Sequence, residues 1–263
     1  MCLLLLIKDI KHMMTNKMIG IVGGVGSYAG IDLIKKVYDL TEALSDQDHL
    51  PVSMLSVPHK IIDRTKYLLG ETEINPGIAI AEIIASLIAS GSSIIAIPCN
   101  TAHARPILSL IEKSIPESCV LVNLIEEVGL YISTKHPEIT KVGVLGTTGT
   151  ILAKVYPEVL AKYNIEVIQP SEDIQDLFVH PSIYDTSYGI KAFSNPVNQK
   201  AKENLGMAAT YLSRKGAQAV ILGCTEIPLA IQYEKIEDSL IIDATTVLAA
   251  ALIRESKKME LIA

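Results

Sequence analysis

The sequence predicts an α/β fold made of two similar halves, each with a parallel sheet at its centre. From Met18 onward, short apolar runs alternate with amphipathic stretches, which is typical of parallel strands connected by helices. One strand-like run ends in the glycine turn of Ile21–Gly26, and another ends in the turn of Val144–Thr150. At nearly equal distances beyond these turns, a further apolar run ends in a cysteine. This repeat predicts two halves of the same construction.

The expected strands are the apolar runs that are bounded by turn residues. They cover residues 18–23, 51–57, 93–98, 119–124, 141–146, 166–169, 219–223 and 240–243. The clearest helix begins at Asn75 and Pro76 and continues through Ile88, since an asparagine cap followed by proline is a common helix start. Another helix extends from about 196 to 214 and ends at Gly216. Residues 178–195 lack a regular period and are expected to form a long, functional or mobile loop.

The composition is that of a large globular protein. Of the 263 residues, 49% are hydrophobic and 20% are charged, which provides a sizeable core and argues against a disordered or collagen-like chain. The core must be aliphatic, because the chain has no Trp and only two Phe, Phe178 and Phe193. The net charge of −6, without long basic runs, argues against nucleic acid as a partner.

Cysteine usage points to a reducing compartment. The four cysteines, Cys2, Cys99, Cys119 and Cys224, are too few for a disulfide framework in a chain of this length. They contain no C-x-x-C pair, so neither a structural zinc site nor any other metal site is expected. The expected location is the cytoplasm.

Residues 1–17 are expected to be an extension outside the fold. Met1–Ile7 is apolar, but Lys8 interrupts this run before a signal-peptide core is complete. No other window is long and apolar enough to span a bilayer, so no membrane is expected as a partner. Met18 directly precedes the first expected strand and would be a natural start.

Two of the cysteines occupy matching positions in the two halves. Cys99 stands between SIIAIP and NTAHARPIL, and Cys224 stands between AVILG and TEIPLAI. Both lie where a buried strand gives way to a helix, so that N–H groups at the helix start can stabilise a thiolate. Cys119 instead opens an ordinary apolar strand, which is typical of a structural cysteine. If the strand C-termini of the halves face each other, Cys99 and Cys224 lie across one cleft.

Two facing thiols suit a reaction that removes a proton from one face of a carbon and returns a proton to the other face. Racemisation at Cα is such a reaction, with one cysteine as thiolate base and the other as thiol acid. Without a cofactor, the carbanion needs hydrogen-bond donors, and no lysine has a convincing context for pyridoxal phosphate. Candidate donors lie just after the same strand ends: Asn100, Thr101, Thr147, Thr148, Thr150 and Thr225.

These motifs resemble the aspartate/glutamate racemase superfamily, and specifically its cofactor-independent aspartate racemase branch. The resemblance rests on IVGGVG, IPCNTAH, LGTTGT and LGCTEIPL, and it extends from Met18 to about Arg254. It implies that Cys99 and Cys224 are the catalytic acid and base. It also implies that Arg64, in PHKIIDRT, and Lys191, in YGIKAF, bind the substrate's side-chain carboxylate. The remaining substrate contacts are expected from Val25, Asn100, Thr101, Thr147, Thr148, Thr225 and Glu226.

The aspartate branch is favoured by residues in and beside the motifs. Glutamate racemases usually have Asp-Ser near the first glycine turn and His after the second C-T, whereas this chain has IVGGVG and Glu226. Hydantoin racemases lack the C-T-E pattern, and decarboxylase relatives keep only one of the two cysteines. The chain departs from the branch at Val25–Gly30, where VGSYAG replaces M-G-P followed by Ala-Thr.

The resemblance also implies an architecture and partners. Two Rossmann-like, flavodoxin-like domains are expected, related by a pseudo-twofold axis, with the active site in the cleft between them. The first domain is expected to comprise residues 18–115 and 238–263, and the second residues 116–237. The expected substrate is a small acidic amino acid, the expected assembly is a homodimer, and no cofactor is expected.

Three alternatives remain open at this point. A glutamate racemase, or one of broader specificity, would keep both cysteines, and so would a catalytically silent protein that only binds an acidic amino acid. The glycine run from Gly24 to Gly30 permits a nucleotide-binding oxidoreductase, but the second expected strand lacks the acidic residue at its end that such proteins use. Two neighbours of the cysteines also have ordinary explanations: His103 as a helix-surface residue and Glu226 as an acid in the first turn of a helix.

Overall fold

The computed structural model describes residues 16–258. Within this range, the strands form a four-stranded sheet in the order β2-β1-β3-β4 and a five-stranded sheet in the order β6-β5-β7-β9-β8. The paired strands are parallel, except that β8 runs antiparallel to β9. The predicted α/β class with two parallel-sheet halves is confirmed. Most of the expected N-terminal extension lies outside the described residues, whereas Lys17 donates its backbone N–H to the Ser256 carbonyl.

The strands lie where the apolar runs predict them, within two residues at most ends. Their bounds are β1 Ile19–Gly23, β2 Val52–Ser56, β3 Ile94–Ala96, β4 Val120–Val122, β5 Lys141–Leu145, β6 Glu166–Ile168, β7 Ala219–Leu222, β8 Lys235–Ile236 and β9 Ser239–Asp243. The residues of β1 and β7 are buried throughout, as expected of strands that are covered on both faces. Strand β8 is not predicted, because a strand of two residues is too short to show a hydrophobic pattern.

The bounds of the helices are α2 Ser27–Asp39, α3 Arg64–Leu68, α4 Gly77–Ala89, α5 Arg105–Glu112, α6 Leu124–Lys135, α7 Thr148–Leu152, α8 Val155–Leu160, α9 Glu172–Ile174, α10 His180–Tyr184, α11 Gln199–Arg214 and α12 Ala244–Ser256. Helices α3, α6, α7, α11 and α12 begin at polar caps, whose side chains accept backbone N–H groups of the first turn. At the start of α4, Asn75 accepts a hydrogen bond from the Gly77 N–H. Helix α11 is capped by Asn198 and is followed by Gly216, whose φ of 91° suits only glycine.

The prediction of an irregular loop at residues 178–195 is wrong for the residues up to Tyr184. Residues 175–179 form a π-helical turn that continues directly into α10. Pro181 lies in the first turn of α10, directly after the π-helical turn. The irregular segment therefore begins after Tyr184 and continues to the cap of α11.

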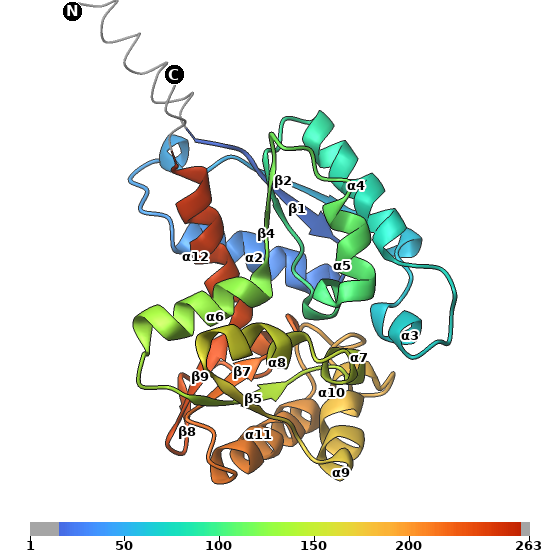
Figure 1. Cartoon of the computed structure of the whole chain (residues 1–263), viewed down its shortest axis with the longest axis vertical. Coiled ribbons are helices and arrows are strands. Elements are labelled where there is room, and N and C mark those ends of the chain that lie inside the picture. Colours follow the sequence, from blue (N-terminus) through green and yellow to red (C-terminus); the bar gives the residue numbers. More distant parts are fainter. Residues whose placement is uncertain (1–15, 259–263) are drawn as a thin grey trace, which may run out of the picture.

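The two sheets share one central core. One hydrophobic cluster combines Ile19 and Ile94 of the first sheet with Val142 and Ile221 of the second. Separate clusters fill the outer face of each sheet, under α4 and α5 on one side and under α11 on the other. Figure 1 shows this arrangement, with α6 between the two sheets and α12, in red, beside it. The C-terminal ends of β3 and β7 are thereby fixed relative to each other.

The sheets do not follow the predicted domain boundaries at two strands. β4 pairs with β3 in the first sheet, although residues 116–237 are expected to form the second domain. β9 pairs with β7 in the second sheet, although residues 238–263 are expected to belong to the first. Helix α12, which follows β9, packs against α2 of the first half. Hydrogen bonding to a neighbouring strand, which periodicity does not reveal, decides the sheet to which a strand belongs.

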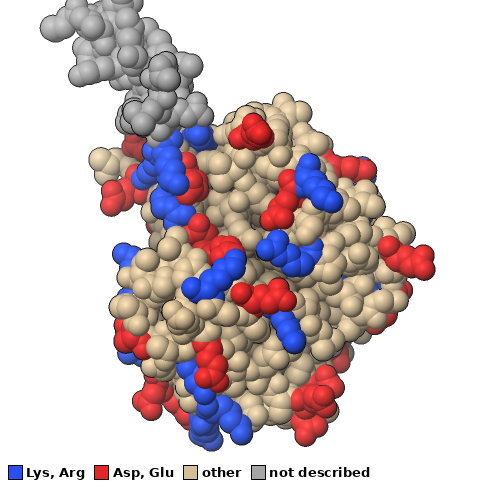
Figure 2. Space-filling model, viewed as in Figure 1, with Lys and Arg blue, Asp and Glu red and all other residues tan. Residues whose placement is uncertain are grey.

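No helix within residues 16–258 is both long and apolar enough to cross a membrane. On the face seen in Figure 2, basic and acidic side chains are interspersed. On this face, the described residues therefore present no continuous field of one sign.

Candidate active site

The two matching cysteines lie on loops that touch. Cys99 follows β3 and Cys224 follows β7, and each is about nine-tenths buried, with 6% of its surface exposed. The Thr225 hydroxyl donates a hydrogen bond of 2.8 Å to the Pro98 carbonyl. The residue that follows one cysteine thus binds the residue that precedes the other. The structure therefore brings the two cysteine motifs together at the junction of the halves.

Cys224 begins a chain of hydrogen bonds that ends at Lys191. The Cys224 thiol donates to Glu226 Oε2 at 3.1 Å, and Lys191 Nζ donates to Glu226 Oε1 at 2.7 Å. Burial and the Glu226 charge raise the pKa of the Cys224 thiol well above its usual value. Burial alone would raise the pKa of Glu226, but the Lys191 ammonium holds it below its ordinary value. Cys224 is therefore a protonated thiol beside an ionised carboxylate.

Arg64 is a second buried cation in the same region. It is 7% exposed, and its guanidinium donates to the carbonyls of Val25, at 3.2 Å, and Ile62, at 3.4 Å. Burial alone would lower the pKa of Arg64, but its interactions with Cys99 and Asp63 raise that pKa above its usual value. Its Nε has no hydrogen-bond partner in the part of the chain that the structure describes. Arg64 thus places a positive charge beside Cys99 and retains a donor.

Asp63 and Tyr184, which are not among the predicted site residues, complete the surroundings of the two cations. Asp63 caps α3 by accepting the backbone N–H groups of Thr65 and Lys66. The Tyr184 hydroxyl donates to an Asp63 oxygen at 3.1 Å, and Lys191 lies over the Tyr184 ring at 5.3 Å. The only sequence signal for Asp63 is its place beside Arg64 in PHKIIDRT.

The threonines that were predicted to bind substrate do not lie in one cluster. Thr101 and Thr147 lie 3.0 Å apart in a buried cluster of hydroxyls, which also contains Thr65 and Thr150 at 2.8–3.2 Å from their neighbours. This hydroxyl cluster joins elements of both halves. Thr148 lies elsewhere, with its hydroxyl 2.9 Å from His180 Nδ1.

The first glycine turn packs directly against Glu226. Gly26 has a φ of 119°, and a Cβ at this position would lie 2.6 Å from Glu226 Oε1. A side chain there would therefore be strained and would displace the carboxylate. The contribution of the predicted residue Val25 is its carbonyl, since its side chain is buried.

A cavity of about 580 Å³ opens beside these residues. Its walls include Arg64, Asp63, Lys191, Phe193 and Glu226, from both halves of the molecule. The cavity therefore presents two cations and two carboxylates to a ligand. Such a set suits a small zwitterion with a further charge.

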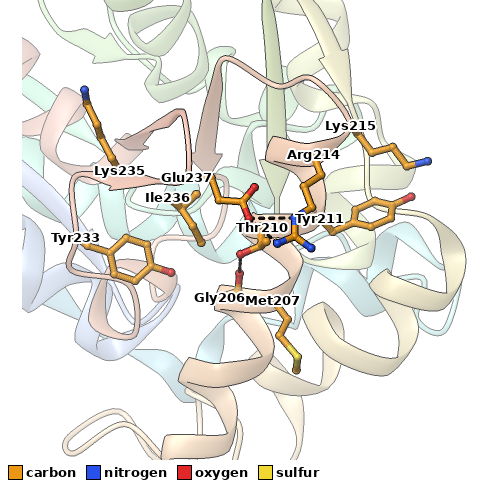
Figure 3. Close-up of a pocket in the computed structure, with 10 residues that line it drawn as sticks. All are labelled: Gly206, Met207, Thr210, Tyr211, Arg214, Lys215, Tyr233, Lys235, Ile236 and Glu237. Carbon is orange, nitrogen blue, oxygen red and sulfur yellow. Dashed lines mark hydrogen bonds and ion pairs between the residues drawn. The ribbon is translucent and has the colours of Figure 1, made fainter.

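A larger cavity of about 850 Å³ lies elsewhere, between α11 and the segment of β8. Figure 3 shows its lining, in which Arg214 is already paired with Glu237 and Tyr233 stands on the opposite wall. None of the residues predicted to bind substrate lines this cavity.

His103 has a structural position. Its Nδ1 lies 2.8 Å from the Cys99 carbonyl, and its Nε2 accepts the Leu124 N–H at 3.3 Å. Both ring nitrogens are therefore used, with one donor and one acceptor, as in a neutral imidazole. The side chain is buried rather than on a helix surface, and it connects the Cys99 loop to α6.

This histidine makes folding sensitive to acid. Burial lowers the pKa of His103 to about 4, whereas an unfolded histidine titrates near 6.5. Between these pH values, a proton binds to the histidine of the unfolded chain but not to that of the folded chain. We therefore expect the free energy of unfolding to decrease by about 3 kcal/mol in total as the pH falls from about 6.5 to 4. Urea unfolding at several pH values should show a flatter dependence in His103→Gln. The exposed control His59→Gln should keep the wild-type slope, and an unchanged slope in His103→Gln would contradict the assignment.

Known proteins resemble this chain over most of its length. The family model described as Asp/Glu/hydantoin racemase matches residues 22–252. The chain belongs to this family. Among solved structures, aspartate racemase from Picrophilus torridus is 28% identical, with a TM-score of 0.75, over 93% of this chain and 96% of that one. This likeness spans nearly the whole of both chains.

More distant members of the family share the fold. An aspartate racemase homologue from Pyrococcus horikoshii is 23% identical, with a TM-score of 0.70, over 92% of this chain and all of that one. Glutamate racemase from Francisella tularensis, solved with D-glutamate, is 20% identical, with a TM-score of 0.66, over 94% of this chain and 85% of that one. A curated relative from Pectobacterium carotovorum, an uncharacterized protein in the pnlA 3′ region, is 35% identical over 100 residues. These residues make up 38% of this chain and 61% of the relative's length.

Proposed function

We propose that this chain is a cofactor-independent racemase that interconverts L- and D-aspartate, with Cys99 and Cys224 as its two bases. The proposal rests above all on the contact between the two cysteine loops, with a buried cation beside each cysteine. Residues of both halves line the neighbouring cavity, which supports a site between the halves.

The two thiols have different surroundings. Cys224 donates to Glu226 and therefore starts as the thiol, which can deliver a proton. Cys99 interacts with the Arg64 guanidinium, so a thiolate at Cys99 has a cation beside it. The Cys99 thiolate removes the Cα proton from one face, and the Cys224 thiol returns a proton to the other. Afterwards Cys99 is the thiol and Cys224 the thiolate, which is the state that the opposite enantiomer requires.

The cations supply the preference for an acidic substrate. The Nε of Arg64 binds no other described residue, and Lys191 lines the same cavity, so both can bind the side-chain carboxylate of aspartate. Because Lys191 already binds Glu226, substrate must share this ammonium with it. Binding of the substrate to Lys191 therefore weakens the ion pair between Lys191 and Glu226. Asn100 and the hydroxyl cluster are the expected partners of the α-carboxylate.

A racemisation assay in heavy water tests the proposal. Purified protein is incubated with each enantiomer of aspartate, glutamate and alanine, and the products are separated by chiral chromatography and weighed by mass spectrometry. We expect aspartate to racemise fastest, with deuterium at Cα of every inverted molecule, because the delivering thiol exchanges with solvent before it acts. Retention of the original hydrogen in early product would contradict the two-base mechanism. Binding of aspartate without racemisation would identify a silent binding protein.

A further inference from the structure

Tyr156 connects the two cysteine loops, although it belongs to neither. It lies in α8 and is 1% exposed. Its hydroxyl donates a hydrogen bond of 2.6 Å to Oδ1 of Asn100, the residue that follows Cys99. Its ring lies against Gly223, the residue that precedes Cys224, since a Cβ on Gly223 would be 3.1 Å from the ring carbon Cε2. One rigid side chain therefore spans from one loop to the other.

Asn100 leaves a donor without a partner. Its side chain is 2% exposed, and its Nδ2 has no hydrogen-bond partner among residues 16–258. A buried N–H without a partner is costly and is rare in folded proteins, so such a group points to a ligand that completes its hydrogen bonds. The acceptor atom of the same amide is fixed by Tyr156. Consequently the Tyr156 hydroxyl also decides which way the amide nitrogen points.

The hydroxyl can play this part at any physiological pH. Burial, together with the charge of Asp243, raises the pKa of the Tyr156 phenol well above its ordinary value. The phenol therefore keeps its proton and remains a donor. Without it, the amide could turn and present its oxygen to an anion, which would repel a carboxylate instead of binding it.

We propose that Tyr156 is a positioning residue, whose hydroxyl fixes the Asn100 amide with its nitrogen toward the α-carboxylate of the substrate. The inference rests on the proposed function, because that function supplies the carboxylate. Tyr156 would thus belong to the site, although it lies outside the sequence motifs. Tyr156 acts through Asn100 and touches neither the reacting carbon nor the protons that move.

The test is a double-mutant cycle with Tyr156→Phe, Asn100→Ala and the double variant. Phenylalanine keeps the ring against Gly223 and removes only the hydroxyl. We expect Tyr156→Phe to raise KM for both enantiomers of aspartate by about tenfold, with little change in kcat, because one positioned hydrogen bond to an anion is lost. Asn100→Ala should show at least the same loss. The double variant should be no worse than Asn100→Ala, since the hydroxyl then has no amide to orient.

Succinate provides a readout that needs no turnover. Calorimetric binding of this unreactive dicarboxylate should weaken in parallel with KM. Tyr131→Phe is the matched control, because it removes a tyrosine hydroxyl that lies 3.4 Å from His136 and outside the site, and it should leave KM unchanged. Thermal unfolding of each variant separates these effects from a loss of stability.

Independent losses that multiply in the double variant would overturn the proposal, as would an unchanged KM in Tyr156→Phe with a lower melting temperature. If the wild-type protein racemises no amino acid, the proposed function fails. Succinate binding then tests Tyr156 separately, and either equal affinity in wild type and Tyr156→Phe or no binding at all would overturn the positioning role.

Discussion

Cys99→Ser and Cys224→Ser are each expected to slow the inversion of aspartate by about a thousandfold or more. A serine hydroxyl is a much weaker acid than a thiol, so it neither forms the required anion near neutral pH nor delivers a proton as readily. Each single substitution should suffice, because every inversion uses both cysteines. Initial rates from both enantiomers, measured by chiral chromatography, give the comparison.

Each variant should retain one half of the reaction. The cysteine that remains can still exchange the Cα hydrogen of one enantiomer with heavy water, and the favoured enantiomer should differ between the two variants. Cys119→Ser is the matched control, since Cys119 is half-buried near the start of β4 and should be dispensable. Full racemisation by either active-site variant would refute the mechanism.

Arg64→Ala is expected to reduce the turnover of aspartate by about tenfold to a hundredfold, because a charge-assisted hydrogen bond contributes about 1.5–3 kcal/mol. The loss for a neutral amino acid, if the protein accepts one, should be much smaller. The measurement is kcat/KM for both substrates, with the exposed Arg105→Ala as control. Lys191→Met should show the same selectivity.

Equal losses for both substrates would mean that Arg64 supports the fold and not the preference for acidic substrates. This outcome is worth testing directly, because Arg64 also donates to the Val25 and Ile62 carbonyls. Arg64→Lys keeps the charge but loses the planar pair of donors, so it separates the two contributions. If charge selects the substrate, Arg64→Lys should keep more of its activity on aspartate than Arg64→Ala.

Local sequence patterns were sufficient to predict the strands and several helices. Continuous apolar runs such as Ile19–Gly23 are buried on both faces, and caps such as Asn198 act over a few neighbouring residues. The placement of β4 and β9 depends instead on which strand each one pairs with, far along the chain. Periodicity carries no information about such partners.

The same distinction explains which site residues were predicted. Cys99 and Cys224 stand in short motifs with repeated context, so their proximity can be anticipated from the repeat. Tyr156 and Tyr184 reach the site through contacts with residues more than fifty positions away. Neither lies in a motif, and only the folded structure reveals what their hydroxyls bind.

The path of the last strand and helix determines how the protein could be divided. β9 supplies the second sheet with a strand between β7 and β8, and α12 then packs against α2 of the first half. Asp243, at their junction, caps α12 and forms an ion pair of 2.6 Å with Lys36. A fragment that ends before Ser239 would therefore leave an open edge on one sheet and an uncovered apolar surface on the other half. The first half is therefore built from two separate segments of the chain, β1–β4 and α12, and a hybrid with a relative would have to exchange both segments together.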